Sequence, residues 1–424
     1  MDDGVSIATT LYTPDGAVPV GGRPGVVVLH GLAGNRGSVD AISASFATAG
    51  YAVLAYDARG HGASGGEITL AGPREVADLR TIRNAFAARG DVNDSKIGAW
   101  GISYGGGQIW NALAAGVPFA AAEVVETWTS LYDALWPQNL ARSGIVAGFA
   151  ASVAARSPLI AGLRDAAVQS TNQPAIRQLT AERSALSKAS SIRTPVFLLQ
   201  GRSDFAFDLS QVTRAYSRLA GPKSLYVGTF GHTPSAFPSN DIAYVLSQGR
   251  AWFDRHLKGI PVGSASGSAW PPVVVAAQGG ERTAFRSLPS TVKKTFALRG
   301  NSVVAGSATV TRRTAPLSTA LESWGGGTAT VTVPKLKRYP RLVVTVLAGS
   351  KVVAHGGLKP KVGVNQVTLA NYCVYVPKGT RLRVTVGAAS PAGQIAYLGF
   401  AGSGSATIGA VTLKLSTLAK PISG

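Results

Sequence analysis

A serine stands between glycines in the stretch Gly101-Ile102-Ser103-Tyr104-Gly105-Gly106, directly after the strand-like run of residues 96–100. Glycines on both sides of a serine let a strand and a helix approach each other closely at a sharp turn. Such a turn lifts the serine hydroxyl into a cleft at the end of a parallel sheet. The stretch therefore predicts a nucleophile elbow with Ser103 as the nucleophile, and it favours an α/β fold.

Two later segments can supply the partners of this serine. A buried strand-like run leads into Asp204, and the next such run leads into His232. The chain order serine, aspartate, histidine is the one that the α/β-hydrolase fold uses. We therefore predict that His232 is the general base and that Asp204 is the acid that orients it. Asp208 is the rival acid, although its position is typical of the start of a helix.

A loop of sequence His-Gly-Leu-Ala-Gly follows the first buried strand-like run and begins at His30. In this fold, that loop and the residue after the nucleophile donate backbone N–H groups to a reacting oxyanion. We expect Leu32 or Ala33 to give one donor and Tyr104 to give the other. We expect His30 to orient the loop and to adjoin the substrate pocket.

The other histidines and the cysteine have structural interpretations. We expect His61 to hydrogen-bond within a loop, His256 to be a cation near the end of a helix, and His355 to lie at the surface. Cys373 stands on a β-like run and is expected to be buried packing. No two histidines have metal-ligand spacing and the chain has 1 cysteine, so we expect neither a metal ion nor an organic cofactor.

Three aromatic residues recur at every fourth position in a short insertion, residues 127–192: Trp128, Tyr132 and Trp136. In a helix this spacing places them on one face, where they either wall an apolar acyl pocket or pack a cap on the domain below. Glu123 and Glu126 precede the insertion. They either bind a substrate amine, as a dipeptidyl-peptidase requires, or order the loop, and the second role is favoured.

The 424 residues suggest two domains. Over residues 1–258, strands alternate with helical patterns, which predicts a mostly parallel sheet with helices on both faces and a short helical cap. Residues 259–272 are rich in Gly, Ser and Pro and are predicted to be a linker. Over residues 273–424, alternating β-branched runs between Gly and Pro turns predict an all-β sandwich.

The second domain is strongly basic. Residues 260–424 hold 19 of the 41 basic residues but only 2 of the 21 acidic residues. This charge either attaches the protein to an anionic surface or only maintains its solubility. The basic positions are Lys335, Lys337, Arg338 and Arg341 in a cluster, with Lys351, Lys359, Lys361, Lys378, Arg381 and Arg383 along later strands. The sequence shows no nucleic-acid-binding motif, so nucleic acid is the less favoured partner.

No apolar run is long enough to span a membrane. The acidic start of the sequence is unlike a signal peptide. We expect either a secreted bacterial protein whose signal peptide was removed or a cytoplasmic protein, and the basic composition favours the first.

The chain resembles the α/β-hydrolases of the peptidase S15 and cocaine-esterase (CocE/NonD) type. The shared motifs are the elbow, D-x-R-G-x-G-x-S over residues 57–64, G-x-x-D over 201–204, G-H-T over 231–233, the opening residues 3–12 and the strand-turn-strand of residues 374–384. The resemblance implies that the C-terminal domain is a jelly-roll-like β-sandwich. The insertion is short for this group. In the family a side-chain tyrosine can serve the oxyanion, where this chain has the loop that begins at His30.

These features predict a serine hydrolase that cleaves carboxylic esters with an apolar acyl or aryl part through an acyl-enzyme. Three alternatives remain open: an Xaa-Pro dipeptidyl-peptidase or amide acylase, an esterase that degrades polyesters in the manner of cutinases and PET hydrolases, and a non-catalytic envelope-binding protein. The substrate is expected to be a small-molecule or polymeric ester.

Overall fold

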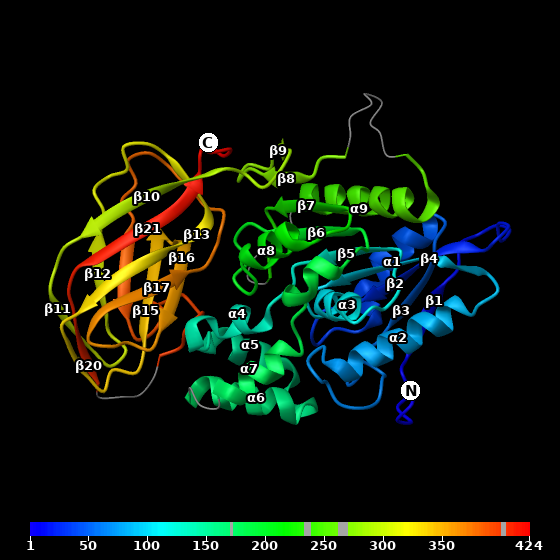
Figure 1. The fold of residues 1–424 in the computed structure, drawn as a ribbon, viewed down its shortest axis with the longest axis horizontal. Helices are drawn as coiled ribbons and strands as arrows, with labels where there is room; N and C mark the ends of the chain where they lie inside the picture. The colour runs from blue at the N-terminus through cyan, green and yellow to red at the C-terminus, as the bar shows by residue number, and fades with distance from the viewer. Residues whose placement is uncertain (170–172, 233–238, 262–269, 400–403) are drawn as a thin grey trace.

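The computed structural model describes residues 1–169, 173–232, 239–261, 270–399 and 404–424. A nine-stranded, mostly parallel sheet forms the core of its N-terminal part (Figure 1), in the order β1-β3-β2-β4-β5-β6-β7-β8-β9. Only the edge pairs β1/β3 and β8/β9 are antiparallel. The strands are β1 (Thr9–Tyr12), β2 (Arg23–Leu29), β3 (Ala52–Tyr56), β4 (Val92–Ile102), β5 (Ala121–Val125), β6 (Val196–Gly201), β7 (Lys223–Gly228), β8 (Val273–Ala276) and β9 (Arg282–Phe285).

Helices cover both faces of this sheet because its inner strands are apolar on both sides. Alternate residues of β2 enter different cores: Val28 packs in one cluster with Phe253, and Val27 packs in another with Ile109. The first face carries α1 (Asp40–Thr48), the short η1 (Arg36–Val39) before it, α9 (Ser239–Phe253) and its π-helical continuation η5 (Asp254–Lys258). The second face carries α2 (Pro73–Ala87), α3 (Tyr104–Ala114) and α8 (Ser210–Arg218).

A group of short helices lies between β5 and β6 and covers the carboxyl ends of the central strands (Figure 1). These helices are α4 (Leu131–Leu135), η2 (Pro137–Asn139), α5 (Ser143–Val153), η3 (Ala154–Arg156), α6 (Pro158–Gln169), α7 (Gln173–Ala181) and η4 (Leu186–Ser191). They occupy the stretch predicted to be the cap. Among the described residues, no helix combines the length and the apolar character needed to cross a membrane.

The C-terminal part consists of antiparallel sheets around a second core (Figure 1). One sheet has the order β10-β21-β13-β17, with β18 also paired to β13; the others are β11-β20-β14 and β12-β19-β15-β16. The strands are β10 (Thr291–Leu298), β11 (Ser302–Ala305), β12 (Thr309–Arg313), β13 (Leu321–Val333), β14 (Lys335–Lys337), β15 (Leu342–Ala348), β16 (Lys351–Leu358), β17 (Gly363–Leu369), β18 (Tyr375–Val376), β19 (Arg383–Gly387), β20 (Ser405–Ile408) and β21 (Val411–Leu418).

The structure moves the domain boundary that the sequence predicted at residue 273. Strands β8 and β9 belong to the first sheet, because β8 pairs in parallel with β7, with Val273 opposite Leu225. The all-β part therefore begins after β9. Residues 262–269 of the predicted linker lie outside the described residues. Trp270, also in the predicted linker, packs against the first domain, where its indole N–H donates to Ser224 Oγ at 2.8 Å.

Three predictions for basic side chains are wrong, and two of them fail because strands of the second domain pack against the cap. His355 lies on β16 and is buried, not at the surface. Arg341 is also buried and donates to Ser143 of the cap at 3.4 Å, whereas Lys335, Lys337 and Arg338 beside it are exposed as expected. His256 packs on Trp252, and burial followed by the nearby Arg255 lowers its pKa to about 4, so it is not a helix-end cation at neutral pH.

Candidate active site

Ser103 sits at the turn between β4 and α3 with φ 52° and ψ −110°, a conformation that costs backbone strain in a non-glycine residue. Its neighbours hold it there. The backbone N–H of Ser103 donates to Val125 O at 2.8 Å, and the hydroxyl of Thr127 donates to Ser103 O at 2.7 Å. Val125 at the end of β5 and Thr127 just after it thus hold the turn that carries Ser103 in place.

The glycines of the elbow are required by close packing. A Cβ on Gly101 would lie 2.7 Å from the carbonyl carbon of Gly105, and a Cβ on Gly105 would lie 2.5 Å from Leu29 O. Both positions face backbone atoms that cannot move aside cheaply. The helix therefore starts directly against the sheet, and Ser103 is raised at its N-terminus.

The structure brings Ser103, His232 and Asp204 together. Ser103 Oγ lies 2.8 Å from His232 Nε2, and His232 Nδ1 lies 2.7 Å from Asp204 Oδ2.

Asp204 is fully buried. Its carboxylate accepts further hydrogen bonds from the backbone N–H of Ala206 at 2.8 Å, the backbone N–H of Phe207 at 3.1 Å and the side-chain amide of Gln200 at 3.1 Å. These hydrogen bonds fix the orientation of the carboxylate against the imidazole.

Asp208, the rival acid, is used elsewhere. Its carboxylate accepts from the backbone N–H of Ser210 at 2.8 Å, where α8 begins, and from the backbone N–H of Asn371 at 3.1 Å. It thus caps a helix and joins the two domains. The structure places Asp204, not Asp208, against the imidazole.

The charges around His232 favour its protonated form. Burial alone would lower the pKa of His232, but the charge and hydrogen bond of Asp204, together with the charge of Glu126, raise it above the ordinary value of 6.5. The hydrogen bond to Asp204 at Nδ1 leaves Nε2 directed at the Ser103 hydroxyl. The arrangement suits an imidazole that accepts a proton from the serine.

Glu126 is a third acid-base group in this cluster, whereas the sequence favoured a loop-ordering role for it over binding of a substrate amine. It follows β5 with φ 46°, it is 2% exposed, and its Oε1 has no hydrogen-bond partner among the described residues. Ligand atoms of Glu126, Asp204 and His232 lie within 4.8 Å of one another. Burial and the charge of Asp204 raise the pKa of Glu126, against the opposing effect of His232. Since Asp204 and His232 hydrogen-bond each other, we interpret the cluster as acid-base groups and not as a metal site.

A small apolar cavity of about 50 Å³ opens beside Ser103. Leu32 and Tyr104 line it, as do Trp128 and Trp136. The remaining lining side chains are apolar and come from the cap and from the loops around it: Leu70, Leu131, Leu135, Val146, Phe149, Ala150, Ile160, Leu163 and Phe207. The cavity beside Ser103 thus includes Leu32 and Tyr104, two of the three residues expected to serve the oxyanion. It also includes Trp128 and Trp136, two of the three aromatic residues predicted in the cap.

Three predicted site residues lie away from this cavity. Helix α4 begins only at Leu131, so the expected face of three aromatics does not form, and Tyr132 points to Asn139 and stacks under Arg177. Ala33 forms a turn with φ 63° and does not line the cavity. His30 is 1% exposed and accepts from the backbone N–H of Ala58 at its Nε2 (3.0 Å), so it braces the loop and lines no pocket with Ser103.

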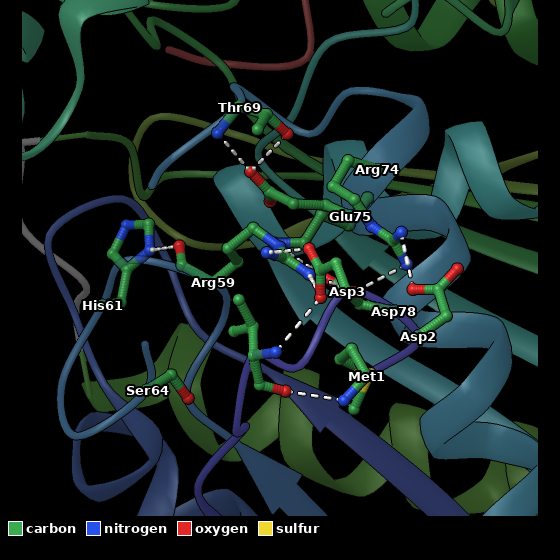
Figure 2. A network of polar contacts seen from close by, with 12 residues as sticks. Met1, Asp2, Asp3, Arg59, His61, Ser64, Thr69, Arg74, Glu75 and Asp78 are labelled. Atoms are coloured by element: carbon green, nitrogen blue, oxygen red, sulfur yellow. Dashed lines mark hydrogen bonds and ion pairs between the residues drawn. The ribbon is translucent and has the colours of Figure 1, made fainter. Parts of the chain in front are cut away.

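A network of charged side chains joins the start of the chain to Arg59 and to helix α2 (Figure 2). Arg59 donates to Asp78 and to Asp3, and His61 donates from its Nδ1–H to Arg59 O at 3.0 Å, within the loop as expected. Glu75 on the same helix as Asp78 accepts from Thr69.

The network reaches the residue after the nucleophile through its phenol. Tyr104 Oη donates to Glu75 Oε1 at 2.6 Å and accepts from the backbone N–H of Ala71 at 2.9 Å. Burial raises the pKa of Glu75 to about 7. These contacts fix the side chain of Tyr104 and with it the start of α3.

The family model for X-Pro dipeptidyl-peptidase (S15 family) matches residues 3–234 of the chain. The chain belongs to the S15 family. The resemblance inferred from the motifs is therefore confirmed. The S15 match covers the elbow and all three residues that meet in the structure, Ser103, Asp204 and His232.

Solved structures with similar folds extend along nearly the whole chain. A CocE/NonD family hydrolase from Staphylococcus aureus is 15% identical with a TM-score of 0.74 and covers 99% of this chain and 92% of its own. An aminopeptidase from a marine sediment Thaumarchaeota archaeon is 12% identical with a TM-score of 0.73, covering 99% and 95%. An α-amino acid ester hydrolase is 14% identical with a TM-score of 0.71, covering 98% and 95%. These likenesses establish the two-part fold.

A curated relative, an uncharacterized 31.7 kDa protein of Escherichia coli, is 31% identical over 110 residues. That match covers 26% of this chain and 37% of the relative. The chain thus spans little more than a third of the length of the curated relatives that it matches.

Proposed function

We propose that the protein is a serine hydrolase that cleaves carboxylic esters with a short apolar acyl group. The observation that carries this proposal is the hydrogen-bonded series from Ser103 through His232 to Asp204, which opens on an apolar cavity. Membership of the S15 family supports hydrolysis of an ester or peptide bond.

The geometry supports a two-step reaction. Ser103 Oγ attacks the acyl carbon while His232 Nε2 takes its proton, and the negative charge moves to the former carbonyl oxygen. The backbone N–H groups of Tyr104 and Leu32 are the candidate donors to that oxygen. His232 then gives the proton to the leaving alcohol, and an acyl-enzyme remains. Water, deprotonated by His232, attacks the acyl carbon and releases the acid and the free serine.

The size of the apolar cavity favours a short acyl chain. A cavity needs about 10–15 Å³ to hold one water molecule. A cavity of about 50 Å³ therefore has room for an acyl chain of about two to four carbons. Its walls of tryptophan, phenylalanine and leucine exclude water and offer no charge to the acyl group. Longer or aryl acyl groups require the cap side chains to move.

The family description makes an Xaa-Pro dipeptidyl-peptidase the second candidate. Such an enzyme needs an acidic group for the substrate amine. Glu126 is buried against Asp204 and His232, and Glu123 is buried where Gly249 of α9 packs against it. Neither lines the apolar cavity. These placements favour the ester over the dipeptide.

A panel of p-nitrophenyl esters of increasing acyl length, assayed beside Gly-Pro-p-nitroanilide, tests the proposal. We expect the highest kcat/KM for the shortest esters and little release from the anilide. Ser103→Ala should abolish both turnover and labelling by a fluorophosphonate probe. Turnover of the anilide above every ester would favour the peptidase, and labelling that persists in the alanine variant would exclude Ser103 as the nucleophile.

A further inference from the structure

A second, larger cavity of about 580 Å³ lies between the two parts of the molecule. On the catalytic side it is lined by residues next to the acid and the base, among them Ser203 and Phe205 around Asp204, and Thr229 and Phe230 before His232. The ring of Phe205 lies 6.5 Å from the ring of His232, measured between centroids. Phe205 thus lies between this cavity and the imidazole, whereas Phe207, which packs 5.2 Å from the same imidazole, lines the apolar cavity.

The β-domain wall of this cavity carries a histidine whose protonation can be assigned. His355 is 6% exposed, and its Nε2 lies 2.8 Å from Tyr372 Oη and 3.4 Å from Nη2 of Arg142. A guanidinium has only donors, so Nε2 of His355 must accept. Burial and the charge of Arg142 hold the pKa of His355 well below its usual value, so the ring is neutral and its proton is on Nδ1.

That Nδ1–H group is a buried donor without a partner among the described residues. The same is true of Thr345 Oγ1, and Thr345 is 1% exposed. The two residues are directly opposite each other on β15 and β16, so their side chains stand together on one face of the sheet. Both line the interdomain cavity. A buried donor that is left unpaired is unfavourable, so this pair favours an acceptor ligand.

The charges around the cavity have one sign. Lys351 lines it, is exposed and forms no ion pair with any described residue, and Arg142 adds a positive charge behind His355. Arg202 also lines the cavity, but Glu322 neutralises it. None of the described lining residues carries a carboxylate. A ligand with an anionic acceptor is therefore favoured and an ammonium group is disfavoured.

We propose that the interdomain cavity binds a carboxylate group, which accepts from His355 Nδ1 and Thr345 Oγ1 and is attracted by Lys351. The carboxylate comes either from the alcohol part of the ester substrate or from a separate small acid. Only the first source rests on the proposed function, and the closeness of the cavity to His232 favours it.

Binding is tested on the full chain with Ser103→Ala, which keeps an ester intact. Calorimetric titration with γ-acetoxybutyrate, with its neutral amide and with succinate measures whether a carboxylate is recognised. We expect γ-acetoxybutyrate to bind and the amide not to bind. Thr345→Val should weaken carboxylate binding about tenfold, the effect of one hydrogen bond to a charged group. Lys351→Gln should weaken it by a smaller factor, because the exposed lysine contributes attraction without a hydrogen bond. Lys359→Gln, an exposed lysine of the same domain outside the cavity, should change nothing.

Equal binding of the acid and the amide, no binding of either acid, or no effect of both variants would overturn the proposal. Turnover by the wild-type enzyme then separates the two sources. If the carboxylate belongs to the substrate, Thr345→Val and Lys351→Gln raise KM for γ-acetoxybutyrate and leave KM for its amide unchanged. If KM is unchanged for both while succinate still binds, the site serves a separate acid. Absence of turnover with retained binding would reject the proposed esterase activity and keep the carboxylate site.

Discussion

Arg202, two residues before Asp204, forms a buried ion pair with Glu322 on β13 of the second domain. The backbone of Arg202 also accepts from the N–H of Cys373 at 2.8 Å. Glu322 further accepts from Ser423 Oγ at 2.7 Å. The loop that carries Asp204 is thus held in place by the all-β domain.

Breaking this ion pair should destabilise the whole protein. Glu322→Gln leaves the Arg202 guanidinium buried without a counter-charge, and such changes cost about 3–5 kcal/mol. Glu281→Gln removes the other acidic residue of residues 260–424, which is exposed, and should have little effect. Chemical denaturation of the two variants and the wild type gives the free energies of unfolding. Equal stability of the two variants would show that the pair contributes little.

The two aspartates after β6 should respond differently to the same substitution. Asp204→Asn removes the carboxylate that fixes the His232 tautomer and should lower kcat by about 10⁴-fold, as in other serine triads. Asp208→Asn keeps one oxygen, which can still accept from the N–H of Ser210 at the start of α8, and loses the acceptor for the N–H of Asn371. Because neither bond involves His232, kcat should stay within about twofold. Steady-state kinetics on a short p-nitrophenyl ester measures both. A larger loss from Asp208→Asn would reassign the acid.

Activity should decline in acid with a midpoint above pH 6.5. In the proposed reaction the neutral form of His232 is the base. Because the pKa of His232 is raised, the imidazole becomes neutral, and kcat/KM increases, only as the pH rises through a value above 6.5. Glu126→Gln removes a carboxyl group whose charge favours the imidazolium, so the acid limb should move to lower pH by about half a unit to one unit. A pH profile of kcat/KM measures the shift.

Glu123→Gln is the matched control for this shift. Glu123 is a buried carboxyl on β5, three residues before Glu126, and it packs against Gly249 and not against His232. Its acid limb should coincide with that of the wild type. If Glu126→Gln also leaves the limb in place, Glu126 only fills space. Difference infrared spectra of the wild-type protein between neutral and alkaline pH, which report a protonated buried carboxyl, provide a second measurement should the variant fold poorly.

The cap should set the acyl length. Leu135 lines the acyl cavity, and Leu135→Ala should enlarge it and move the optimum of the ester panel to longer chains, while costing about 2–5 kcal/mol of stability. Tyr132→Phe on the same helix lies outside the cavity and should keep the original optimum. An unchanged optimum in the Leu135 variant would place the acyl group elsewhere.

The basic second domain should bind anionic surfaces, as we propose from its charge. Cosedimentation of the full chain with anionic vesicles should be strong at low salt and weak above physiological salt. At and above physiological salt the Debye length is about 8 Å or less, so the attraction between the basic domain and the vesicle is screened. The exposed lysines of β14, Lys335 and Lys337, are the first positions to change to glutamine. Binding that is insensitive to salt would contradict an electrostatic attachment.

Local sequence signals were sufficient for the residues that meet at the elbow. Ser103, Asp204 and His232 each follow a short apolar run, and the carboxyl ends of parallel strands meet at one edge of a sheet, so their convergence could be predicted. Glu126 was harder to predict. It also follows such a strand, but its closeness to Asp204 depends on the order of β5 and β6 in the sheet, which the sequence does not state.

Two of the errors depend on structure that the local sequence does not show. His355 was expected at the surface of a strand or loop, but β16 packs near the cap, where His355 contacts Arg142 and is buried. Tyr132 had the right spacing for the pocket face, but α4 is too short to extend the spacing to Trp128. Both outcomes depend on neighbours that are distant along the chain.

The pairing of β8 with β7 decides where the protein can be divided for expression. A chain cut at residue 258 would leave β7 as a bare edge, with unpaired backbone groups that invite aggregation. The C-terminal fragment would in turn carry β8 and β9 as an orphan hairpin. A productive cut has to fall between Phe285 and Thr291, the stretch from the end of β9 to the start of β10, and it would still sever the buried link between Arg202 and Glu322.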